Sequence, residues 1–473
     1  MPPAKAPNAA RTPLRATEIY ALVFGLFLGL AIVKFGNPVI LDQIISPPAS
    51  WSDALHNAWP LHWANWLLAG LAVVGAALAV AKRPRWPGSR WLWILPLIWF
   101  GWQILSALPS PYHDLTSVTL WQFGGCAVCY FLGTFVIGRG RGWQWIMLGV
   151  LAGFAFCLVR AVDQRLFEFP REKQFLLESE HSGWTNMPPE VFQEFQREKV
   201  IIQTNGVDIA NPVIIAKYEK KRVNGTLVYP NALAGLVLLL LPAAIVMVLQ
   251  VTRRLRRTTC IAAVGLTVFL GLAGLFWSGS KSGWLIALAV GMFWLWRLKW
   301  ARRLKWIVAV VVLVGGLVVF GLRFQSYFAK GATSVGARFD YWRAAIQVVE
   351  QRPLLGTGPG TFQRPYATLK RPDAEMARLV HNDYLEQFSD SGLVGGLSYA
   401  AWLALLLGTL GRRLWRAGDW LEFAMFAGLL GWFVQGFIEF SLFVPALAWT
   451  AFTLSGCLLQ RTGNQVDKPA PRD

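Results

Sequence analysis

Charged side chains are scarce in this chain of 473 residues, where they make up 15% against 55% hydrophobic residues. This scarcity excludes an ordinary soluble protein, whose surface carries far more charge. Residues 236–251, 261–277 and 307–322 contain almost no charge over lengths that approach or reach a bilayer span. The composition therefore predicts a membrane protein that buries its apolar surface in lipid and between helices.

Cysteine is also rare, and its placement argues against a disulfide framework. All five cysteines lie inside apolar stretches, and the pair Cys126-x-x-Cys129 has no second pair to complete a zinc site. We interpret the cysteines as small buried hydrophobic residues within helices, and we predict no metal site.

Twelve apolar blocks alternate with polar gaps, and every second gap is basic. These basic gaps and the two chain ends hold 24 of the 45 lysines and arginines but only five of the 26 acids, which accounts for the whole net charge of +19. Under the positive-inside rule this side is cytoplasmic, so both termini are cytoplasmic and the number of spans is even. A nucleic-acid-binding surface would not alternate with apolar blocks, and we exclude it. The predicted spans are residues 19–35, 63–81, 91–107, 116–137, 143–162, 229–251, 258–277, 281–297, 305–322, 392–411, 420–438 and 441–460.

These spans predict an all-α polytopic bundle of about twelve helices with two long extracytoplasmic segments. No small-x-small cleavage site follows Val33, so we expect the first helix to be retained. The first of these segments is an insertion over residues 163–228. It has ten acids and nine bases, and residues 189–202 are expected to form a short helix. The predicted regions are 1–162 (about five spans), the insertion 163–228, 229–322 (about four spans), the loop 323–391, and 392–473 (about three spans) with its cytoplasmic tail.

The loop 323–391 contains an amphipathic helix, predicted over residues 338–350. Apolar residues recur there at helical spacing, and Arg343 falls on another face. Such a helix suits a position on the membrane or over the bundle. The apolar positions are Phe339, Trp342, Ile346 and Val349.

A glycine-rich turn follows over residues 353–362. Its Gly-x-Gly pattern lacks the preceding strand and the βαβ unit of a nucleotide-binding site, so we interpret it as a tight turn. Exposed amides in such a turn can still contribute to anion binding.

The sequence His381-Asn-Asp-Tyr-Leu-Glu386 comes just before a predicted span. Asp383 and Glu386 have the spacing of a capping box, which predicts that a helix begins at Asp383. His381 would then lie just outside a helix N-terminus, where the partial positive charge favours a neutral ring that can act as a base. The alternative is an ordinary surface histidine in a capped turn.

Two cationic residues on the predicted outer side are expected to have anionic partners. Lys281 lies in the very short turn 278–283, and Arg222 closes a basic run just before residue 224. Cations at outer span ends oppose the positive-inside bias and often have a partner, for which a lipid diphosphate is one candidate. Contact with lipid headgroups or a local ion pair are the alternatives.

In this order, these motifs resemble the O-antigen ligase family, which shares its C-terminal region with O-antigen polymerases. The resemblance covers roughly residues 222–460, and the first 160 residues are similar only in spanning the membrane. The motifs that carry it are residues 224–234, Ser278-Gly-Ser-Lys-Ser-Gly283, Arg338-Phe-Asp-Tyr-Trp342, the turn 353–360, His381-Asn-Asp-Tyr-Leu385 and Gly392-Leu-Val-Gly-Gly396.

The resemblance implies a GT-C-like, inverting and metal-independent glycosyltransferase of the bacterial inner membrane, without a cofactor. Its donor would be a glycan on undecaprenyl diphosphate, and its acceptor a hydroxyl of lipid A-core or another lipid-anchored surface glycan. His381 would remove the acceptor proton. Lys281 departs from the family, which usually has arginine at this position, and a lysine offers a point charge in place of a bidentate fork. The residues expected to bind the diphosphate or substrate are Arg222, Lys281, Arg338, Arg343, Asn382 and Asp383.

Two other functions remain open from the sequence. A polymerase of the same family would use a second lipid-linked glycan as acceptor, and shared motifs do not separate it from a ligase. A small-anion transporter of the bicarbonate type belongs to a different class. Transporters usually have ionisable residues at mid-membrane and repeated halves, whereas these spans are nearly free of acids and show no internal repeat.

Overall fold

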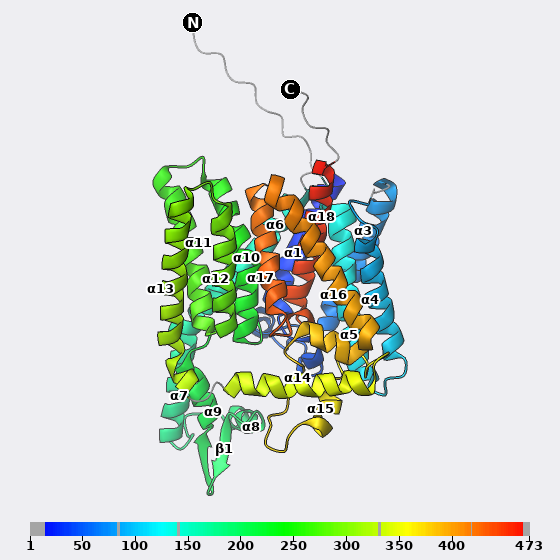
Figure 1. Ribbon diagram of the computed structural model, residues 1–473. Coiled ribbons are helices and arrows are strands. Elements are labelled where there is room, and N and C mark those ends of the chain that lie inside the picture. Colours follow the sequence, from blue (N-terminus) through cyan, green and yellow to red (C-terminus); the bar gives the residue numbers. More distant parts are fainter. Residues whose placement is uncertain (1–14, 83–85, 140–141, 330–332, 418, 467–473) are drawn as a thin grey trace, which may run out of the picture.

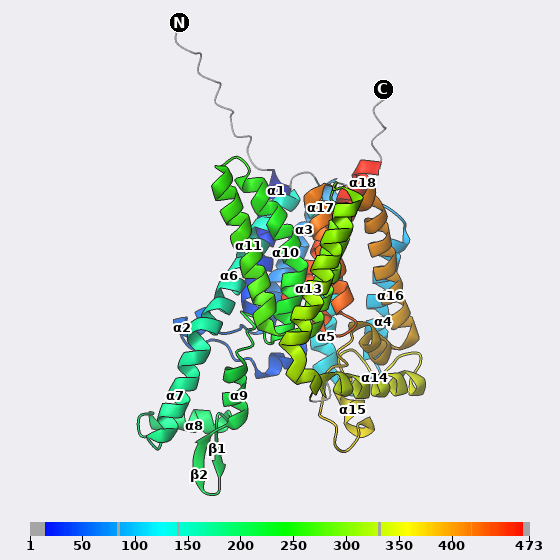
Figure 2. The same ribbon diagram turned by 60° about the vertical axis from the view of Figure 1, so that its left-hand side comes forward.

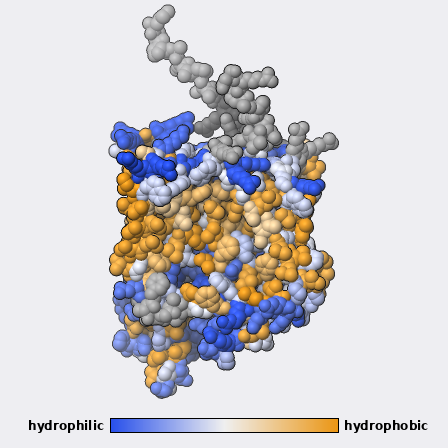
Figure 3. Space-filling view, viewed as in Figure 1, coloured by the Kyte–Doolittle hydropathy of each residue, from blue (hydrophilic) through white to orange (hydrophobic). Residues whose placement is uncertain are grey.

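The computed structural model describes residues 15–82, 86–139, 142–329, 333–417 and 419–466. In these residues the chain forms a bundle of long helices with a smaller external part at one end (Figure 1). Figure 3 shows the molecule from the same side as Figure 1. Hydrophobic residues form a belt across the middle of this side, between hydrophilic residues at both ends. Part of the predicted basic side (residues 1–14, 83–85, 140–141 and 467–473) lies outside the described residues.

Each predicted span coincides with a helix of the described chain. Eight helices are long and apolar enough to cross a membrane, and α4 and α17 are shorter but also apolar. Helices α12 and α18 run beside them (Figure 1). The bounds are α1 Ala16–Lys34, α3 Leu61–Lys82, α4 Trp91–Ala107, α5 His113–Leu132 with its continuation η2 Gly133–Ile137, α6 Gly142–Asp163, α10 Pro230–Thr252, α11 Arg257–Ser278, α12 Lys281–Arg297, α13 Arg302–Ala329, α16 Asp383–Ala417, α17 Trp420–Gln435 and α18 Pro445–Val466.

The insertion forms its own small folded unit around a continuous extension of α6. The helix does not stop near residue 162 but continues through η3 (Gln164–Glu168) into α7 (Phe169–His181). Helices α8 (Pro189–Arg197) and α9 (Pro212–Lys220) complete the unit, with a hairpin at its tip (Figure 2). Its apolar core contains Leu176, Trp184, Met187, Ile201 and Ala210.

The all-helical character of the fold is confirmed, and the insertion adds one short β-hairpin to it. Strands β1 (Ile201–Thr204) and β2 (Val207–Ala210) pair in antiparallel register around Asn205 and Gly206. Both turn residues have positive φ, which suits a two-residue hairpin. The predicted helix over 189–202 therefore ends early, at Arg197, because the β-branched Ile201 is buried in the core of the unit as part of a strand.

The predicted loop 323–391 is shorter in the structure, since α13 continues to Ala329 and α16 begins at Asp383. Its residues 333–382 lie across the end of the bundle that we call the α14 end (Figure 1). Helix α14 (Thr333–Gln351) crosses the ends of the long helices, and α15 (Gln363–Leu369) lies beyond it (Figures 1 and 2). The predicted amphipathic helix is thus confirmed and begins earlier. Short connecting helices are η1 Val39–Ile44, α2 Trp51–His56 and η4 Ser441–Phe443.

Helix α16 is broken near its start, and the glycine-rich turn fills the break. Ser391 and Gly392 leave helical geometry, with φ of 67° at Gly392. A Cβ there would lie 2.2 Å from the Leu354 carbonyl oxygen, so only glycine allows this approach. The amide of Gly360 donates to the Asp390 carboxylate at 2.7 Å. The Gly360 amide is therefore bound to Asp390 of the same chain and is not exposed to an external anion.

Close backbone contact holds α1 against α6. Both helices carry a Gly-x-x-x-Gly pattern at the contact, Gly25 with Gly29 and Gly149 with Gly153. A Cβ added to Gly29 would lie 2.3 Å from the Gly149 carbonyl oxygen. In lipid, where apolar side chains gain little by leaving the solvent, such close packing is a main source of helix association.

We predict that Gly29→Ala destabilises the protein by about 1–3 kcal/mol, because backbone atoms opposite the new methyl group cannot yield easily. Gly70→Ala is the control, since a Cβ there meets nothing within 4 Å. Thermal unfolding of both purified variants in detergent measures the difference. Equal melting temperatures for the two variants would contradict this account of the α1–α6 contact.

Candidate functional site

Most of the polar residues selected from the sequence gather at the α14 end. They come from the segment before α10, the start of α12, helix α14 and the start of α16. The turn between α17 and α18 contributes Glu439, which the sequence analysis missed. This acid stands alone among Phe437, Ile438 and Phe440 in a short turn between two apolar helices. An isolated acid in such a turn was a signal that could have identified it.

Glu439 is the centre of the cluster, and its side chain is fully buried. One carboxylate oxygen lies 2.7 Å from Arg338 Nη2 and accepts a second bond from Asn231 Nδ2 at 2.7 Å. The Tyr229 hydroxyl donates to the other oxygen at 3.4 Å. A carboxylate removed from water requires such partners. Glu439 therefore ties α14 to the start of α10.

His381 faces the same carboxylate. Its Nδ1 lies 3.7 Å from Glu439 Oε2, and its side chain is 29% exposed. The ring stacks on Tyr341, with centroids 5.8 Å apart, and meets Phe440 edge-on at 4.7 Å. Its backbone has φ of 56°, a left-handed conformation that costs energy for a residue with a Cβ. Aromatic walls and a carboxylate thus orient the imidazole within a strained turn.

The predicted helix start at Asp383 is confirmed, but the capping box is wrong by one residue. The Asn382 side chain is the cap and accepts from the amides of Tyr384 and Leu385 at 3.1 and 3.0 Å. The Asp383 carboxylate instead accepts from the Leu442 amide at 3.2 Å. Glu386 reaches back to the amide of Val380 at 2.9 Å. These bonds fix the backbone on both sides of His381.

Arg222 lies beside the cluster and is joined to it through Asn231. Its Nη2 donates to Asn231 Oδ1 at 3.1 Å, and its Nε donates to the Ser278 carbonyl oxygen at 2.8 Å. Burial lowers the pKa of the Arg222 guanidinium; the Glu439 carboxylate raises it, and the positive charges of Arg323 and Arg338 lower it further. Arg222 thus lies within electrostatic reach of one carboxylate and two other cations.

Lys281 begins α12, directly after the turn against which Arg222 packs. Its Nζ lies 3.8 Å from the centroid of the Tyr327 ring and 5.2 Å from that of Phe324. Aromatic faces stabilise an ammonium group without neutralising it. Arg323, another cation absent from the sequence prediction, stacks near Phe324 at 5.6 Å. Lys281 lies close enough to Arg222, Arg338 and Arg323 for their positive charges to repel its own.

Arg343 does not join these residues. It follows Arg338 by five positions on α14, a rotation of about 140° around the helix axis, and its side chain is exposed. Its predicted contact with substrate stays a prediction. The structure therefore brings His381, Arg338 and Arg222 together through Glu439, with Lys281 beside them and Asn382 and Asp383 in the supporting backbone.

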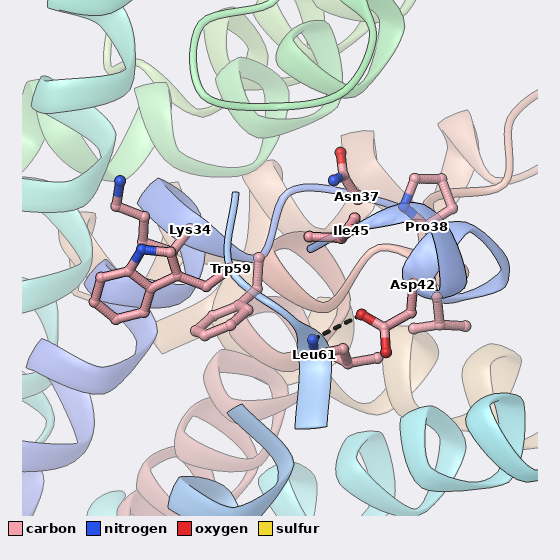
Figure 4. A pocket seen from close by; sticks show the side chains of 9 residues that line it. Lys34, Asn37, Pro38, Asp42, Ile45, Trp59 and Leu61 are labelled. Carbon is pink, nitrogen blue, oxygen red and sulfur yellow. Dashed lines mark hydrogen bonds between the residues drawn. The ribbon is translucent and has the colours of Figure 1, made fainter. Parts of the chain in front are cut away.

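Two cavities of the described residues lie apart from the cluster. A 640 Å³ cavity lies between the end of α1 and α6, lined by Lys34, Arg160 and residues 224–228 among others. A much smaller pocket of about 10 Å³ surrounds Trp59 and has room for at most one water molecule (Figure 4). There Asp42 accepts from the Leu61 amide at 2.7 Å, which fixes the start of α3.

Comparisons with known proteins identify part of the chain. Residues 266–400 match the family model described as O-antigen ligase. That segment includes Lys281, Arg338 and His381, but not Arg222 or Glu439. A Haemophilus influenzae protein described as an uncharacterized protein is 26% identical over 142 residues. That match covers 25% of this chain and 35% of the relative, so the chain spans about a third of that relative's length.

We predict that Arg338→Ala destabilises the protein by about 3–5 kcal/mol, because it leaves the buried Glu439 carboxylate without its charged partner. Adding Glu439→Gln should recover part of this loss, since no buried charge then remains. Arg343→Ala removes the same side chain from an exposed position of the same helix and should cost less than about 0.5 kcal/mol. Unfolding in detergent measures all three. Similar losses for the two arginine variants would contradict a central role for the Arg338–Glu439 pair.

Proposed function

We propose that this chain, whose residues 266–400 match the O-antigen ligase family model, transfers a glycan from undecaprenyl diphosphate to an acceptor hydroxyl. The acceptor is lipid A-core or another surface glycan at the outer face of the bacterial inner membrane. One observation carries the proposal: the His381 imidazole is held in a strained turn opposite a buried carboxylate, next to a group of cations.

His381 acts as the general base in this proposal. Its Nδ1 is directed at Glu439, so Nε2 is the ring atom that takes the proton from the acceptor hydroxyl. The carboxylate then stabilises the imidazolium that forms. Glycine or asparagine would adopt the positive φ of residue 381 at a lower cost. Histidine at this position is therefore better explained by its ring than by the turn.

The cations receive the leaving group. As the acceptor oxygen bonds to the anomeric carbon, the bond from that carbon to the diphosphate oxygen breaks on the opposite face and inverts the configuration. The diphosphate keeps the electron pair of that bond and gains negative charge. Arg222, Lys281 and Arg338 supply positive charge beside it, as electrostatic catalysis requires. The reaction written in this way uses no metal ion.

The proposed topology has twelve spans, which adds α4, α12, α17 and α18 to the eight longer apolar helices. The alternation of basic gaps supports it, because the described basic gaps between α10 and α11 and between α12 and α13 lie at the end opposite α14 (Figure 1). The α14 end would then face the periplasm, where lipid-linked glycans and their acceptors meet.

The orientation predicts that a reporter active only outside the cytoplasm works when it is fused after Thr368, at the end of α15. The same reporter fused after Arg254, in the basic gap between α10 and α11, should be inactive. Enzymatic activity of the two fusions, normalised to protein level, is the measurement. The reverse pattern would overturn the orientation and with it the periplasmic site.

The mechanism predicts that His381→Asn lowers glycan transfer about 10²–10⁴-fold, the usual contribution of a general base. The variant should fold at least as well as the wild type, because asparagine tolerates the positive φ. Surface glycan on a gel, with protein level and melting temperature, reports both effects. His381→Ala should lose transfer as well.

His181→Asn is the matched control, because it changes an exposed histidine at the end of α7. Transfer at wild-type level by a stable His381→Asn variant would refute the role of this residue as base. The accumulated lipids then separate two reactions. A ligase variant accumulates polymer on its lipid carrier, whereas loss of a polymerase leaves single repeat units on the acceptor.

A further inference from the structure

A separate cavity lies at the end of the bundle opposite α14, between the end of α12 and the beginning of α13. It has a volume of 400 Å³ and is lined by three tryptophans and two cations. The Trp296 and Trp306 rings make an edge-to-face contact in its wall, with centroids 5.0 Å apart. The lining residues are Trp296, Trp300, Arg302, Lys305 and Trp306.

The charge of this cavity has no counterpart within the described residues. Lys305 Nζ donates to the Trp296 carbonyl oxygen at 3.1 Å, and neither Lys305 nor Arg302 forms an ion pair with any described residue. The sequence contains no aspartate or glutamate from residue 220 to residue 339. On the neighbouring α17, Glu422 already pairs with Arg461 at 2.6 Å. An anion from outside the chain is therefore the natural partner for these two cations.

The position of the cavity indicates where such an anion comes from. Its tryptophans are 41–52% exposed, and exposed tryptophans at span ends mark the interface between lipid and water. Helix α13 then presents an apolar surface along its length, with Ile307 60%, Val311 64% and Val314 53% exposed. A molecule with an anionic head in the cavity can lay its acyl chains on this surface.

We propose that the cavity binds a phospholipid whose headgroup carries a net negative charge. Arg302 and Lys305 contact the phosphate, and the tryptophans enclose the glycerol region. The bound lipid fills the gap between α12 and α13, which are joined at this end only by residues 298–301. This site is independent of the glycan transfer proposed above.

Lipid binding to the purified full-length protein tests this inference by native mass spectrometry. Phosphatidylglycerol and cardiolipin should bind the wild type at least about tenfold more tightly than zwitterionic phosphatidylethanolamine, since each nearby cation favours an anionic headgroup. Arg302→Gln, and more strongly Arg302→Gln with Lys305→Gln, should reduce this preference about tenfold. The same anionic lipids should raise the melting temperature of the wild type more than that of the variants.

Arg253→Gln with Arg254→Gln is the matched control, because it removes two exposed cations from another basic gap that does not line the cavity. The single variant Arg302→Gln should fold normally, since Arg302 is exposed and its side chain makes no hydrogen bond to the described residues. Trp300→Ala keeps the charges and should weaken all three lipids equally. Equal binding of anionic and zwitterionic lipids by the wild type would overturn the proposal. So would unchanged binding by the Arg302 variants, or an equal loss in the control.

Discussion

The carboxylate of Glu439 is the interaction on which the α14 end of the molecule depends. It is fully buried, and a buried charge is tolerated only when charged and hydrogen-bonding partners surround it. Arg338 brings α14 to it, and Asn231 brings the start of α10. His381 faces it from the start of α16. One acid on a short turn thus draws together segments that are far apart in the sequence.

Other buried acids at the same end hold the backbone in place. Asp390 accepts from the Gly360 amide, and Asp383 accepts from the Leu442 amide, so both carboxylates act as anchors for loops. Neither acid forms an ion pair with a described lysine or arginine, whereas Glu439 pairs with Arg338. Arg222 has the carboxylate of Glu439 and the cations Arg323 and Arg338 within electrostatic reach. An end of the bundle built in this way is suited to a strongly anionic ligand such as a lipid diphosphate.

The sequence predicted the helices well because each is specified by local chemistry. A run of apolar residues long enough for a bilayer can only be satisfied by a helix in lipid, whatever the rest of the chain does. The close contact of α1 and α6 was harder to foresee. It depends on the contact between Gly29 and Gly149. The sequence of one span does not determine which other span packs against it. The hairpin at residues 201–210 was not predicted, because Ile201 becomes buried only when the other segments of the insertion pack around it.

The residues of the candidate site also fall into two groups, those that the sequence indicates and those that only the structure shows. His381, Arg222, Lys281 and Arg338 could be selected from the sequence, because polar groups beside apolar spans need a reason to be there. Their common partner could not, since Glu439 lies 58 residues after His381 and 101 residues after Arg338. The sequence by itself determined the membrane character, the positions of the helices and the cationic residues. Only the tertiary structure decided which of those residues meet, that Asn382 rather than Asp383 is the cap, and that Arg343 lies apart. The reason is that burial and charge pairing depend on contacts between distant segments, whereas hydropathy is a property of each segment alone.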